Sequence, residues 1–510
     1  MQITLAGYNL DSAVMDEIRE LTDLPRSVPD DLPSLAKIID SLAKEPLTPE
    51  TISAAYARIS RSPSSVSELR RDARSSVSRT RQSNERIVFG LGHASVAEHA
   101  VFNLDITGIS RLALEALEAH RLASYTEGSQ RYIASSGDFE VPDEVREIGL
   151  TNRFTESVHK LFAGYRELIT LLEKHYADLP EHERNTKSRE DSRYVLPLAC
   201  RSQVGITLNA RGAESVIHAC NQAPLAEVKL IGKQMADVLR HIGPSLIRYI
   251  EPNPKWSASE SALAQTACQV ASHAVPKFRD ESAVELIDYP REGEILAVAG
   301  LLFRRGSDSF KNCLEHVRKM SDAERCRIVI DSHNYLSVHD PVRRELELGT
   351  FVFSITLSAS AFAQLKRHRM ATIIAQHYQP ELGVTTPPIL QEVGGLNIFN
   401  ECLKTSEELY RALVKSLHSN VKSAAQYALT NAHRRRVVFQ ANSRELTHLS
   451  RLREDAYAQW DIRATAKDMI RLAREACPGL MLIAAGKDAF PDLHAQLFPG
   501  EHLPIAEGKA

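Results

Sequence analysis

The sequence predicts an α/β protein, in the mixed α+β sense, made of two tandem domains that are each a sheet flanked by helices. Two observations lead to this prediction. Residues 110–132 and 358–380 resemble one another, reading SRLALEALEAHRLASYTEGSQRY and SASAFAQLKRHRMATIIAQHYQP. Each is preceded by a stretch in which apolar and polar residues alternate, which is typical of a half-buried strand. The chain therefore carries two copies of one strand-and-helix unit.

The alternating stretches lie at 100–112 and 350–360. Their matching apolar residues are Phe102, Leu104 and Ile106 in the first stretch and Phe351, Phe353 and Ile355 in the second. A segment of helical character follows each stretch and carries the AHR or KRHR residues. Residues 151–176 and 401–428 have the 3.6-residue apolar spacing of amphipathic helices, and we expect both to pack in the core.

The duplication extends beyond these elements. Residues 209–215 (NARGAES) have a counterpart at 442–448 (NSRELTH). The two matched pairs are offset by 368 − 120 = 248 and 442 − 209 = 233 residues. Motifs in the same order at nearly the same offset indicate a tandem repeat, and a period this long means two domains. We place repeat 1 at 1–250, a linker with some helix at 251–283, and repeat 2 at 284–510.

The composition is that of an ordinary globular chain. Of 510 residues, 43% are hydrophobic and 25% charged, and the net charge is −3, so there is no electrostatic case for nucleic acid or a membrane as the main partner. No apolar run is long enough to cross a bilayer. The N-terminus has acidic residues early and lacks the basic start and apolar core of a signal peptide. Seven cysteines without a CxxC pair fit reduced thiols, so we expect a cytoplasmic protein.

Three further polar clusters are interpreted as structural. The Ser- and Arg-rich residues 61–79 favour a solvated helix face over a phosphate site, and HRRRVV at 433–438 favours an ordinary surface. His93 with Glu98 or His99, at i+5 or i+6, resembles a metal-binding pair, but i+5 is poor helical geometry for a shared metal and no third ligand clusters with the pair. We predict no metal.

The polar residues of the two similar segments suit a nucleotide. Glu127, Ser129 and Arg131 alternate, so an extended or irregular loop turns them to one side. A guanidinium and a hydroxyl there can hold a phosphate. Gln364 and Arg367 are i, i+3 neighbours on one helix face, and the glutamine amide suits the edge of a base. Neither repeat has all these groups, but the chain has them once.

The motifs GHASVAEHAVFNLDITGISR, HRLASYTEGSQRY, RYVLPL and NAR resemble the flavin-dependent thymidylate synthases. The signature of that family is Arg-His-Arg, seven residues, then Ser. Repeat 1 has Ala119, His120 and Arg121, with Ser129 in place, whereas repeat 2 has Arg367, His368 and Arg369 intact, with His377 instead of Ser. Repeat 2 also ends with the family-like NSREL and RLREDAYAQWDIR.

The resemblance implies an α/β fold and a definite reaction. FAD and dUMP bind between subunits of a homotetramer in that family. The methylene of methylenetetrahydrofolate goes to C5 of dUMP, and flavin reduced by NADPH supplies the hydride. The dUMP site is shared. One subunit gives the Gln and first Arg of the signature helix with an Arg near the C-terminus, and the other gives the Glu-x-Ser-x-Arg run with the Arg of the RYVLP-type segment.

The losses divide along the two sides of that shared site. By position, repeat 1 keeps the second group, namely Glu127, Ser129, Arg131 and Arg193, where repeat 2 has Ala375, His377, Gln379 and Gln426. Gln130 of the same run is a further expected substrate contact. Repeat 2 keeps the first group, namely Gln364, Arg367 and Arg453, where repeat 1 has Ala116, Ala119 and Cys220. We therefore predict that the repeats form a pseudo-dimer with one working dUMP site, and that two chains form a homodimer equivalent to the family tetramer.

Residue roles follow from the resemblance. Arg453 is the expected catalytic residue, stabilising negative charge on the uracil. Arg131 and Arg193, with Ser129, are expected to hold the phosphate, and Gln364 and Arg367 to position the nucleotide. The expected FAD contacts are His93, Ser95, His120, Arg121, Asn209 and Arg211 in repeat 1, with His368, Arg369, Asn442 and Arg444 in repeat 2.

Two alternatives share these residues. One is a flavin- or nucleotide-binding relative without catalysis, for which losses should fall at random and not in a clean partition. The other is a one-carbon transferase acting on another pyrimidine nucleotide, whose phosphate and ribose contacts look the same. Two departures bear on them, because Tyr457 stands where many members have His and His448 where some have Asn.

Overall fold

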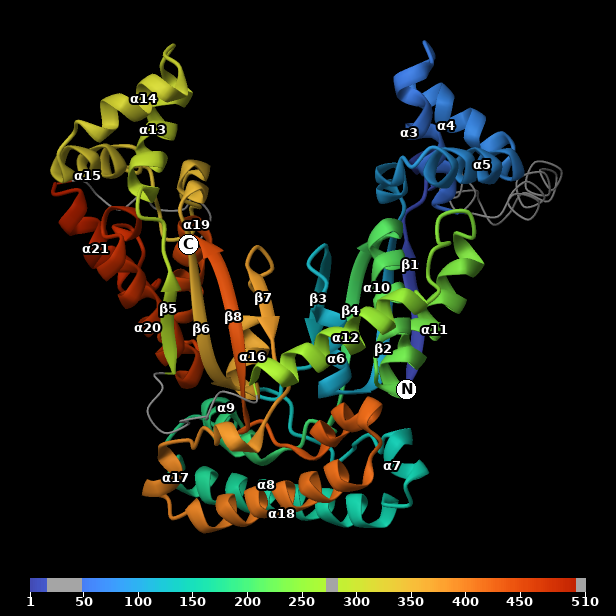
Figure 1. Cartoon of the computed structure of the whole chain (residues 1–510), viewed down its shortest axis with the longest axis vertical. Coiled ribbons are helices and arrows are strands. Elements are labelled where there is room, and N and C mark those ends of the chain that lie inside the picture. The colour runs from blue at the N-terminus through green and yellow to red at the C-terminus, as the bar shows by residue number, and fades with distance from the viewer. Residues whose placement is uncertain (16–47, 272–282, 501–510) are drawn as a thin grey trace, which may run out of the picture. The chain divides into compact units, whose positions relative to one another are not determined.

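The structure is a computed structural model that describes residues 1–15, 48–271 and 283–500. It contains two four-stranded antiparallel sheets of identical order (Figure 1). The first sheet has the order β1-β2-β4-β3, with β1 Gln2–Tyr8, β2 Val101–Ser110, β3 Ala123–Glu127 and β4 Arg201–Asn209. The second has the order β5-β6-β8-β7, with β5 Val284–Asp288, β6 Thr350–Ser358, β7 Thr372–Ala375 and β8 Arg434–Asn442. The predicted mixed fold with two similar sheets is confirmed.

The strands form where the sequence alternates. Phe102, Leu104 and Ile106 on β2 are buried, as are Phe351, Phe353 and Ile355 on β6, while the alternate residues of both strands are more exposed. Side chains of period two bury one face of a strand, so each sheet presents one apolar face to its helices. In the second sheet this face packs against helix α20, whose Met469 is also fully buried.

The helices of repeat 1 surround the first sheet or continue from it. They are α3 Glu50–Arg58, α4 Val66–Ser75, α5 Val77–Asn84, α6 Arg111–Glu118, α7 Asp143–Glu147, α8 Thr151–His175, α9 Glu181–Ser192, α10 Ala210–Gln222 and α11 Ala226–Ile242. The predicted linker contains α12 Pro254–Ala271, and its residues 272–282 lie outside the described part of the chain. The Ser- and Arg-rich segment forms α4 and α5, where Ser65 and Glu68 build a capping box.

Repeat 2 contributes a second set of helices. They are α13 Gly293–Arg305, α14 Phe310–Arg318, α15 Asp322–Asp331, α16 Ala359–Leu365, α17 Ile389–Glu392, α18 Leu396–Ser416, α19 Ser443–Arg453, α20 Trp460–Ala476 and α21 Phe490–Leu497. The predicted helix at 401–428 is wrong at its end, because α18 stops at Ser416 and a 3₁₀ segment follows at Ser419–Ala428.

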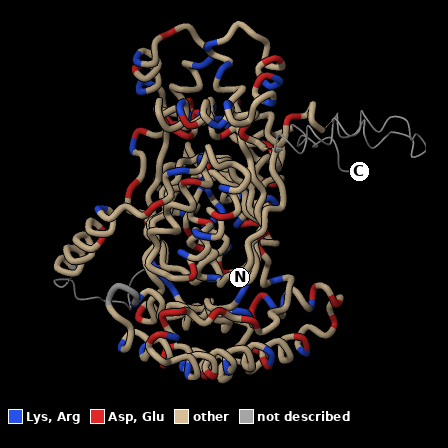
Figure 2. Tube along the Cα trace, turned by 90° about the vertical axis from the view of Figure 1, so that its right-hand side faces the viewer, with Lys and Arg blue, Asp and Glu red and all other residues tan. Residues whose placement is uncertain are grey.

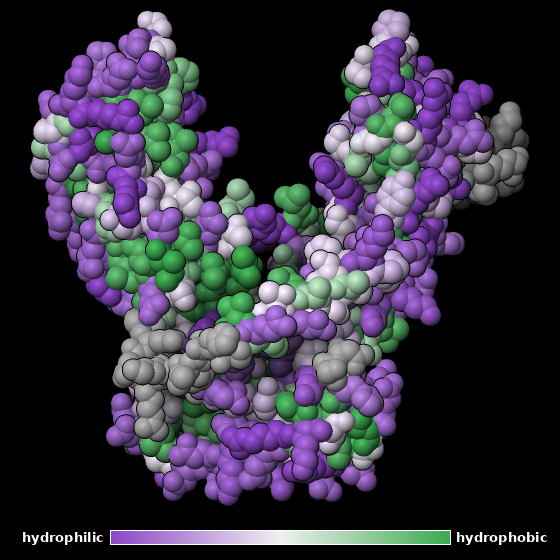
Figure 3. All heavy atoms as spheres, in the orientation of Figure 1, coloured by the Kyte–Doolittle hydropathy of each residue, from purple (hydrophilic) through white to green (hydrophobic). Residues whose placement is uncertain are grey.

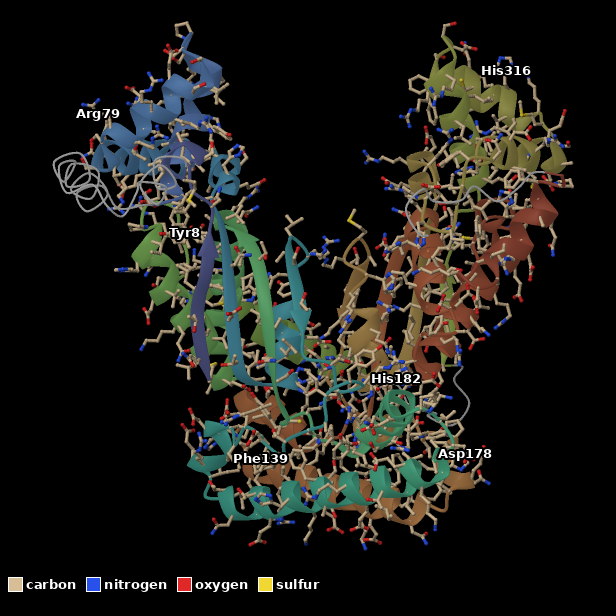
Figure 4. The ribbon with its side chains drawn as sticks, turned by 180° about the vertical axis from the view of Figure 1, so that it is seen from behind. Tyr8, Arg79, Phe139, Asp178, His182 and His316 are labelled. Carbon is tan, nitrogen blue, oxygen red and sulfur yellow. The ribbon has the colours of Figure 1, made fainter. Side chains whose placement is uncertain are left out.

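Helices α8 and α18 are amphipathic and pack closely. The visible surface over α18 is mostly hydrophilic (Figure 3), whereas its Phe399 and Leu413 are fully buried. A Cβ at Gly164 of α8 would lie 2.2 Å from the Sγ of Cys402 of α18, so only glycine permits this approach. At the start of α8, Phe154 packs against Phe139, which Figure 4 labels, with ring centroids 6.4 Å apart.

The chain divides into two compact units that do not follow the repeats. One unit comprises Met1–Thr155, Leu198–Val275 and Ala412–Tyr427, and the other comprises Glu156–Pro197, Pro276–Arg411 and Ala428–Ala510. We call these units 1 and 2. Unit 1 thus contains a segment of repeat 2, and unit 2 contains a segment of repeat 1. Each repeat therefore contributes one segment to the unit that contains most of the other repeat.

A buried tyrosine anchors the exchanged segment in each unit. In unit 1 the hydroxyl of Tyr427 donates to Glu227 (2.7 Å), which also accepts from the hydroxyl of Ser110 (2.6 Å). In unit 2 the hydroxyl of Tyr194 donates to Asp461 (3.0 Å), and the hydroxyl of Ser358 donates to the same carboxylate.

These two clusters match across the repeats. Ser110 and Ser358 cap the first helix after β2 and β6, and burial raises the pKa of both Glu227 and Asp461. Each unit is therefore closed by the other repeat through the same kind of hydrogen-bonded cluster.

Candidate functional site

The first group of predicted residues begins at α16 in unit 2. Ser358 caps this helix, and its last turn carries Gln364, so the short helix aims that side chain. The Nε2 of Gln364 is buried and finds no hydrogen-bond partner in the described part of the chain. A buried amide donor left unpaired costs free energy, so this atom is suited to an acceptor on a ligand. Arg367 follows in the turn and is exposed.

Arg453 lies at the end of α19 and meets the same turn. Its Nε donates to the Nε2 of His368 at 3.2 Å. Burial, together with the nearby positive charge of Arg367, lowers the pKa of Arg453 to about 10. No carboxylate forms an ion pair with Arg453 among the described residues. The neighbouring guanidiniums of Arg367 and Arg453 therefore form a site suited to binding an anion.

Unit 2 also contains Arg193, which belongs to repeat 1. The residue is only 7% exposed, and its main-chain carbonyl accepts from the side chain of Asn431 at 2.9 Å. The next residue, Tyr194, stacks on Trp460 with ring centroids 5.5 Å apart. The exchanged segment thus fixes one residue of the second group in the unit that holds the whole first group, Gln364, Arg367 and Arg453.

The rest of the second group lies in unit 1, at the end of β3. Glu127 is the last residue of the strand, and a turn follows in which the hydroxyl of Ser129 accepts from the N–H of Arg131 at 3.3 Å. The carboxylate of Glu127 pairs with Arg111 at 2.7 Å, and both side chains are almost fully buried. Burial opposes the charge of Arg111, but carboxylates led by that of Glu127 outweigh it and raise its pKa.

Sequence reasoning missed Arg111. A signal was present, because repeat 2 has alanine at both matching positions, Ala359 for Arg111 and Ala375 for Glu127. Loss of both partners together is what a buried ion pair requires, since either charge alone is costly. Arg111 therefore belongs with the retained residues of repeat 1, as the partner that holds Glu127.

A pocket opens beside the Ser129 turn in unit 1. Its volume is about 440 Å³, and its lining includes Ser129, Gln130, Ser202 and Gln203. By the 248- and 233-residue offsets, repeat 2 carries Tyr378, Arg435 and Arg436 at the positions of Gln130, Ser202 and Gln203. The pocket is lined by hydroxyls and amides, which suit a polar ligand.

The matching positions in unit 2 are occupied by larger groups in mutual contact. The guanidinium of Arg435 lies 4.1 Å from the ring centroid of Tyr378 and 4.6 Å from that of Phe362, and its Nε donates to the carbonyl of Gln376 at 2.7 Å. This basic residue of HRRRVV is therefore a packing element. Along the described trace, Lys and Arg are intermingled with Asp and Glu (Figure 2).

The predicted FAD residues of repeat 2 divide between two places. Arg444 lines a second pocket, of about 510 Å³, together with Met370, His448 and Arg451. His368 instead contacts Arg453 and Glu445, and Arg369 is exposed. Asn442 caps α19, its side-chain oxygen accepting from the N–H of Glu445 at 2.9 Å.

The second pocket fits a flavin nucleotide. Arg451 is buried, yet its Nε and Nη2 have no hydrogen-bond partner in the described residues. Burial lowers the pKa of Arg451 to about 10, and the guanidinium stays charged in neutral solution. The Nη1 of Arg451 donates to main-chain carbonyls and Arg444 pairs with Glu347 at 2.7 Å, so the two free nitrogens of Arg451 are the donors suited to a pyrophosphate, and Met370 offers an apolar contact to a ring.

The predicted FAD residues of repeat 1 are more open. His93, Ser95, Arg121 and Arg211 are exposed, and Arg211 pairs with Glu98 at 2.6 Å. His120 is half-buried, and burial lowers its pKa. Asn209 caps α10 as Asn442 caps α19.

Metal ligands do not assemble in the described part of the chain, where no group of three or more His, Cys, Asp or Glu could hold an ion. His99 of the GHASVAEH segment packs edge-on against Tyr56, with ring centroids 4.7 Å apart. Among the described helices none is long and apolar enough to span a membrane.

Comparisons with known proteins identify the family of the chain. A family model described as thymidylate synthase complementing protein matches residues 41–245 and 285–479. The chain belongs to this family. The first matched region contains β2, β3 and β4, and the second contains β6, β7 and β8 with all but the first residue of β5. Membership in the thymidylate synthase complementing proteins therefore covers both repeats.

Relatives of this family fall into two kinds. A UPF0159 protein of Thermoplasma acidophilum is 23% identical over 475 residues, which cover 83% of this chain and 92% of that protein. A flavin-dependent thymidylate synthase of Clostridium tetani is 28% identical over 216 residues, 40% of this chain and 83% of that protein. Another, of Geobacter sulfurreducens, is 32% identical over 173 residues, 32% of this chain and 67% of that protein. The first kind matches nearly the whole tandem, and the second about one repeat.

Proposed function

We propose that the protein methylates dUMP to dTMP, with FAD as cofactor and methylenetetrahydrofolate and NADPH as co-substrates, at one site composed of residues from both repeats. The observation that carries the proposal is the complementary loss of site residues. It is supported by the presence of Arg193 of repeat 1 in the same compact unit as Gln364, Arg367 and Arg453 of repeat 2. Random erosion of a non-catalytic relative has no reason to spare one full set.

The chain's own residues have separable tasks in this proposal. Arg193 binds the phosphate of dUMP by charge-assisted hydrogen bonds. The buried amide nitrogen of Gln364 donates a hydrogen bond to the nucleotide, and Arg367 places a positive charge beside the nucleotide. Arg453, a partly buried cation without a carboxylate partner, stabilises the negative charge that develops on the uracil as C5 becomes nucleophilic.

The flavin residues hold the cofactor and keep it close to the base. Arg444 and Arg451 bind the pyrophosphate of FAD in the pocket of about 510 Å³. When bound, the reduced flavin supplies the hydride. Cys220, which stands in repeat 1 where repeat 2 has Arg453, cannot take over the arginine's task, because burial raises the pKa of this thiol to about 12 and keeps it neutral.

The deciding experiment is tritium release from [5-³H]dUMP with methylenetetrahydrofolate, NADPH and added FAD. We expect folate-dependent release and thymidylate as the product. Arg453→Ala should lower the rate by about 10²-fold or more, as removal of a fixed electrostatic group does, and should leave flavin occupancy unchanged. Cys220→Ala is the matched control from repeat 1 and should keep the rate.

Three results would count against the proposal. A different C5-modified product would identify a transferase acting with another one-carbon unit. Release from a different pyrimidine nucleotide, but not from dUMP, would change the substrate. A folded, flavin-loaded protein that releases no tritium from any of them would be a binding protein.

A further inference from the structure

A buried chain of three side chains in unit 2 leads to Arg453. Glu445 accepts from the Nδ1 of His368 at 2.9 Å, and the Nε2 of His368 accepts from the Nε of Arg453 at 3.2 Å. His368 and Glu445 are only 2% and 7% exposed. The tautomer follows from the chemistry, because an arginine Nε–H can only donate. His368 must therefore be neutral, with its proton on Nδ1 and pointing at Glu445.

The local fold aims these groups at one another. Glu445 is the third residue of α19, and its N–H is held by the capping side chain of Asn442. A glutamate at this position commonly accepts a hydrogen bond from the backbone N–H of the capping residue. Here the carboxylate of Glu445 accepts instead from His368. Glu445 and Arg453 lie eight residues apart on the same helix, α19. Both ends of the three-residue chain thus come from α19, and the histidine bridges them.

The same elements in repeat 1 lack two of the three groups. His120 matches His368, but Gly212 stands at the position of Glu445 and Cys220 at that of Arg453. If the histidine served only a flavin, the carboxylate would have no reason to disappear with the arginine. The joint loss links Glu445 to Arg453, as the joint loss in repeat 2 links Arg111 to Glu127.

We propose that Glu445 and His368 are positioning residues that fix the guanidinium of Arg453 for the reaction. This inference rests on the proposed function, in which Arg453 acts on the uracil. Glu445 orients the imidazole by accepting its Nδ1 proton, and the imidazole then presents Nε2 as an acceptor that holds the arginine Nε. The planar guanidinium is left with its two terminal nitrogens for the substrate.

The arrangement predicts a pH effect. Burial lowers the pKa of His368, while Glu445 opposes that change, and the charges of Arg453 and His448 add to the lowering. The ring of His448 lies 5.8 Å from the ring of His368, and Arg367 is the residue before His368 in the chain. Below the pKa of His368 its Nε2 carries a proton, two donors face each other, and the contact with Arg453 breaks. Activity should therefore fall on the acid side.

The test uses the full-length, FAD-loaded protein and two variants of Glu445. In Glu445→Ala we expect kcat for tritium release from dUMP to fall about 10-fold or more, with KM for dUMP changed less than threefold, because binding groups stay in place. Glu445→Gln can still accept from His368 and should recover most of kcat. Removing the negative charge should also move its acid limb to lower pH, by about half a unit or more.

The control is Glu407→Gln, which alters a glutamate 3.9 Å from another buried histidine, His433, in the same unit. It should match the wild type in kcat and in pH profile. A Glu445→Ala kcat within twofold of wild type would overturn the inference. If that variant fails to fold, an unshifted acid limb in Glu445→Gln would do so.

A structural readout separates this inference from the proposed function. If wild-type protein releases no tritium, the proposed function fails on its own. Crystal structures of the wild type and of Glu445→Ala then still decide the positioning, because the inference requires the Arg453 guanidinium to leave His368 in the variant. An unmoved guanidinium would contradict it.

Discussion

Single residues in this chain have counterparts that act as built-in controls. Arg193 and Gln426 occupy matching positions in the two repeats, and both are buried, at 7% and 5% exposure. Arg435 of repeat 2 replaces Ser202 of repeat 1 and lies over Tyr378. At the second of these pairs, repeat 2 has packing side chains where repeat 1 lines a pocket.

The pair Arg193 and Gln426 gives a prediction at this scale. Replacing Arg193 with Ala should raise KM for dUMP about 10- to 100-fold, because a charged hydrogen bond to the phosphate is worth about 1.5–3 kcal/mol. Gln426→Ala should leave KM within twofold. Steady-state kinetics of the two variants decides the matter, and an equal effect of both would mean that the positions have not diverged in function.

Much of the residue-level site could be predicted from the sequence, and the exceptions have physical reasons. The retention of Gln364, Arg367 and Arg453 in repeat 2 was visible because repeat 1 has alanine or cysteine at the matching sequence positions. The contact of His368 with Arg453 was not visible, since a motif gives the residue type and not the direction of its ring. Arg111 was missed because it opens a helix, where arginine is unremarkable in a sequence.

At the scale of elements, the alternating and helical periods predicted β2, β6, α8 and most of α18. These periods could not predict which elements pack against one another, because amphipathic spacing identifies a buried face but not the element that covers it. The end of α18 at Ser416 was missed for a similar reason, since the apolar spacing continues beyond it. Close packing of α8 on α18 depends on the absence of a side chain at Gly164.

Gly164 gives the prediction at this scale. Alanine is the better helix former, yet Gly164→Ala should lower the free energy of unfolding by about 1–3 kcal/mol, because the new methyl overlaps the Sγ of Cys402. Adding Cys402→Ala removes the obstructing atom and should restore part of the loss. Chemical denaturation of both single variants and the double variant measures the coupling, and strictly additive effects would refute the clash.

At the scale of the whole molecule, the exchanged segments make each unit depend on both repeats. Isolated repeat 1 lacks Tyr427 for Glu227, and isolated repeat 2 lacks Tyr194 for Asp461. Each isolated repeat would expose the surface that the missing segment covers, and would keep a buried carboxyl without its tyrosine donor. The repeats are thus predicted to fold together.

Cutting the chain within the linker tests this dependence. Fragments 1–271 and 283–510, expressed separately, should show no cooperative thermal transition and should bind a hydrophobic dye. Expressed together, they should co-purify and unfold in one transition near that of the intact protein. A cooperative transition in either fragment alone, at the temperature of the intact chain, would show that its unit needs nothing from the other repeat.

The reciprocal exchange of segments also bears on inheritance. Two unlike half-proteins encoded separately would pair with their own kind as well as with each other, and many of those assemblies would lack one set of arginines. Joining them in one reading frame gives every molecule one copy of each half and keeps the two at high mutual concentration. Once the halves are joined, each can lose what the other supplies, and the linker becomes what keeps both sets of residues in the same molecule.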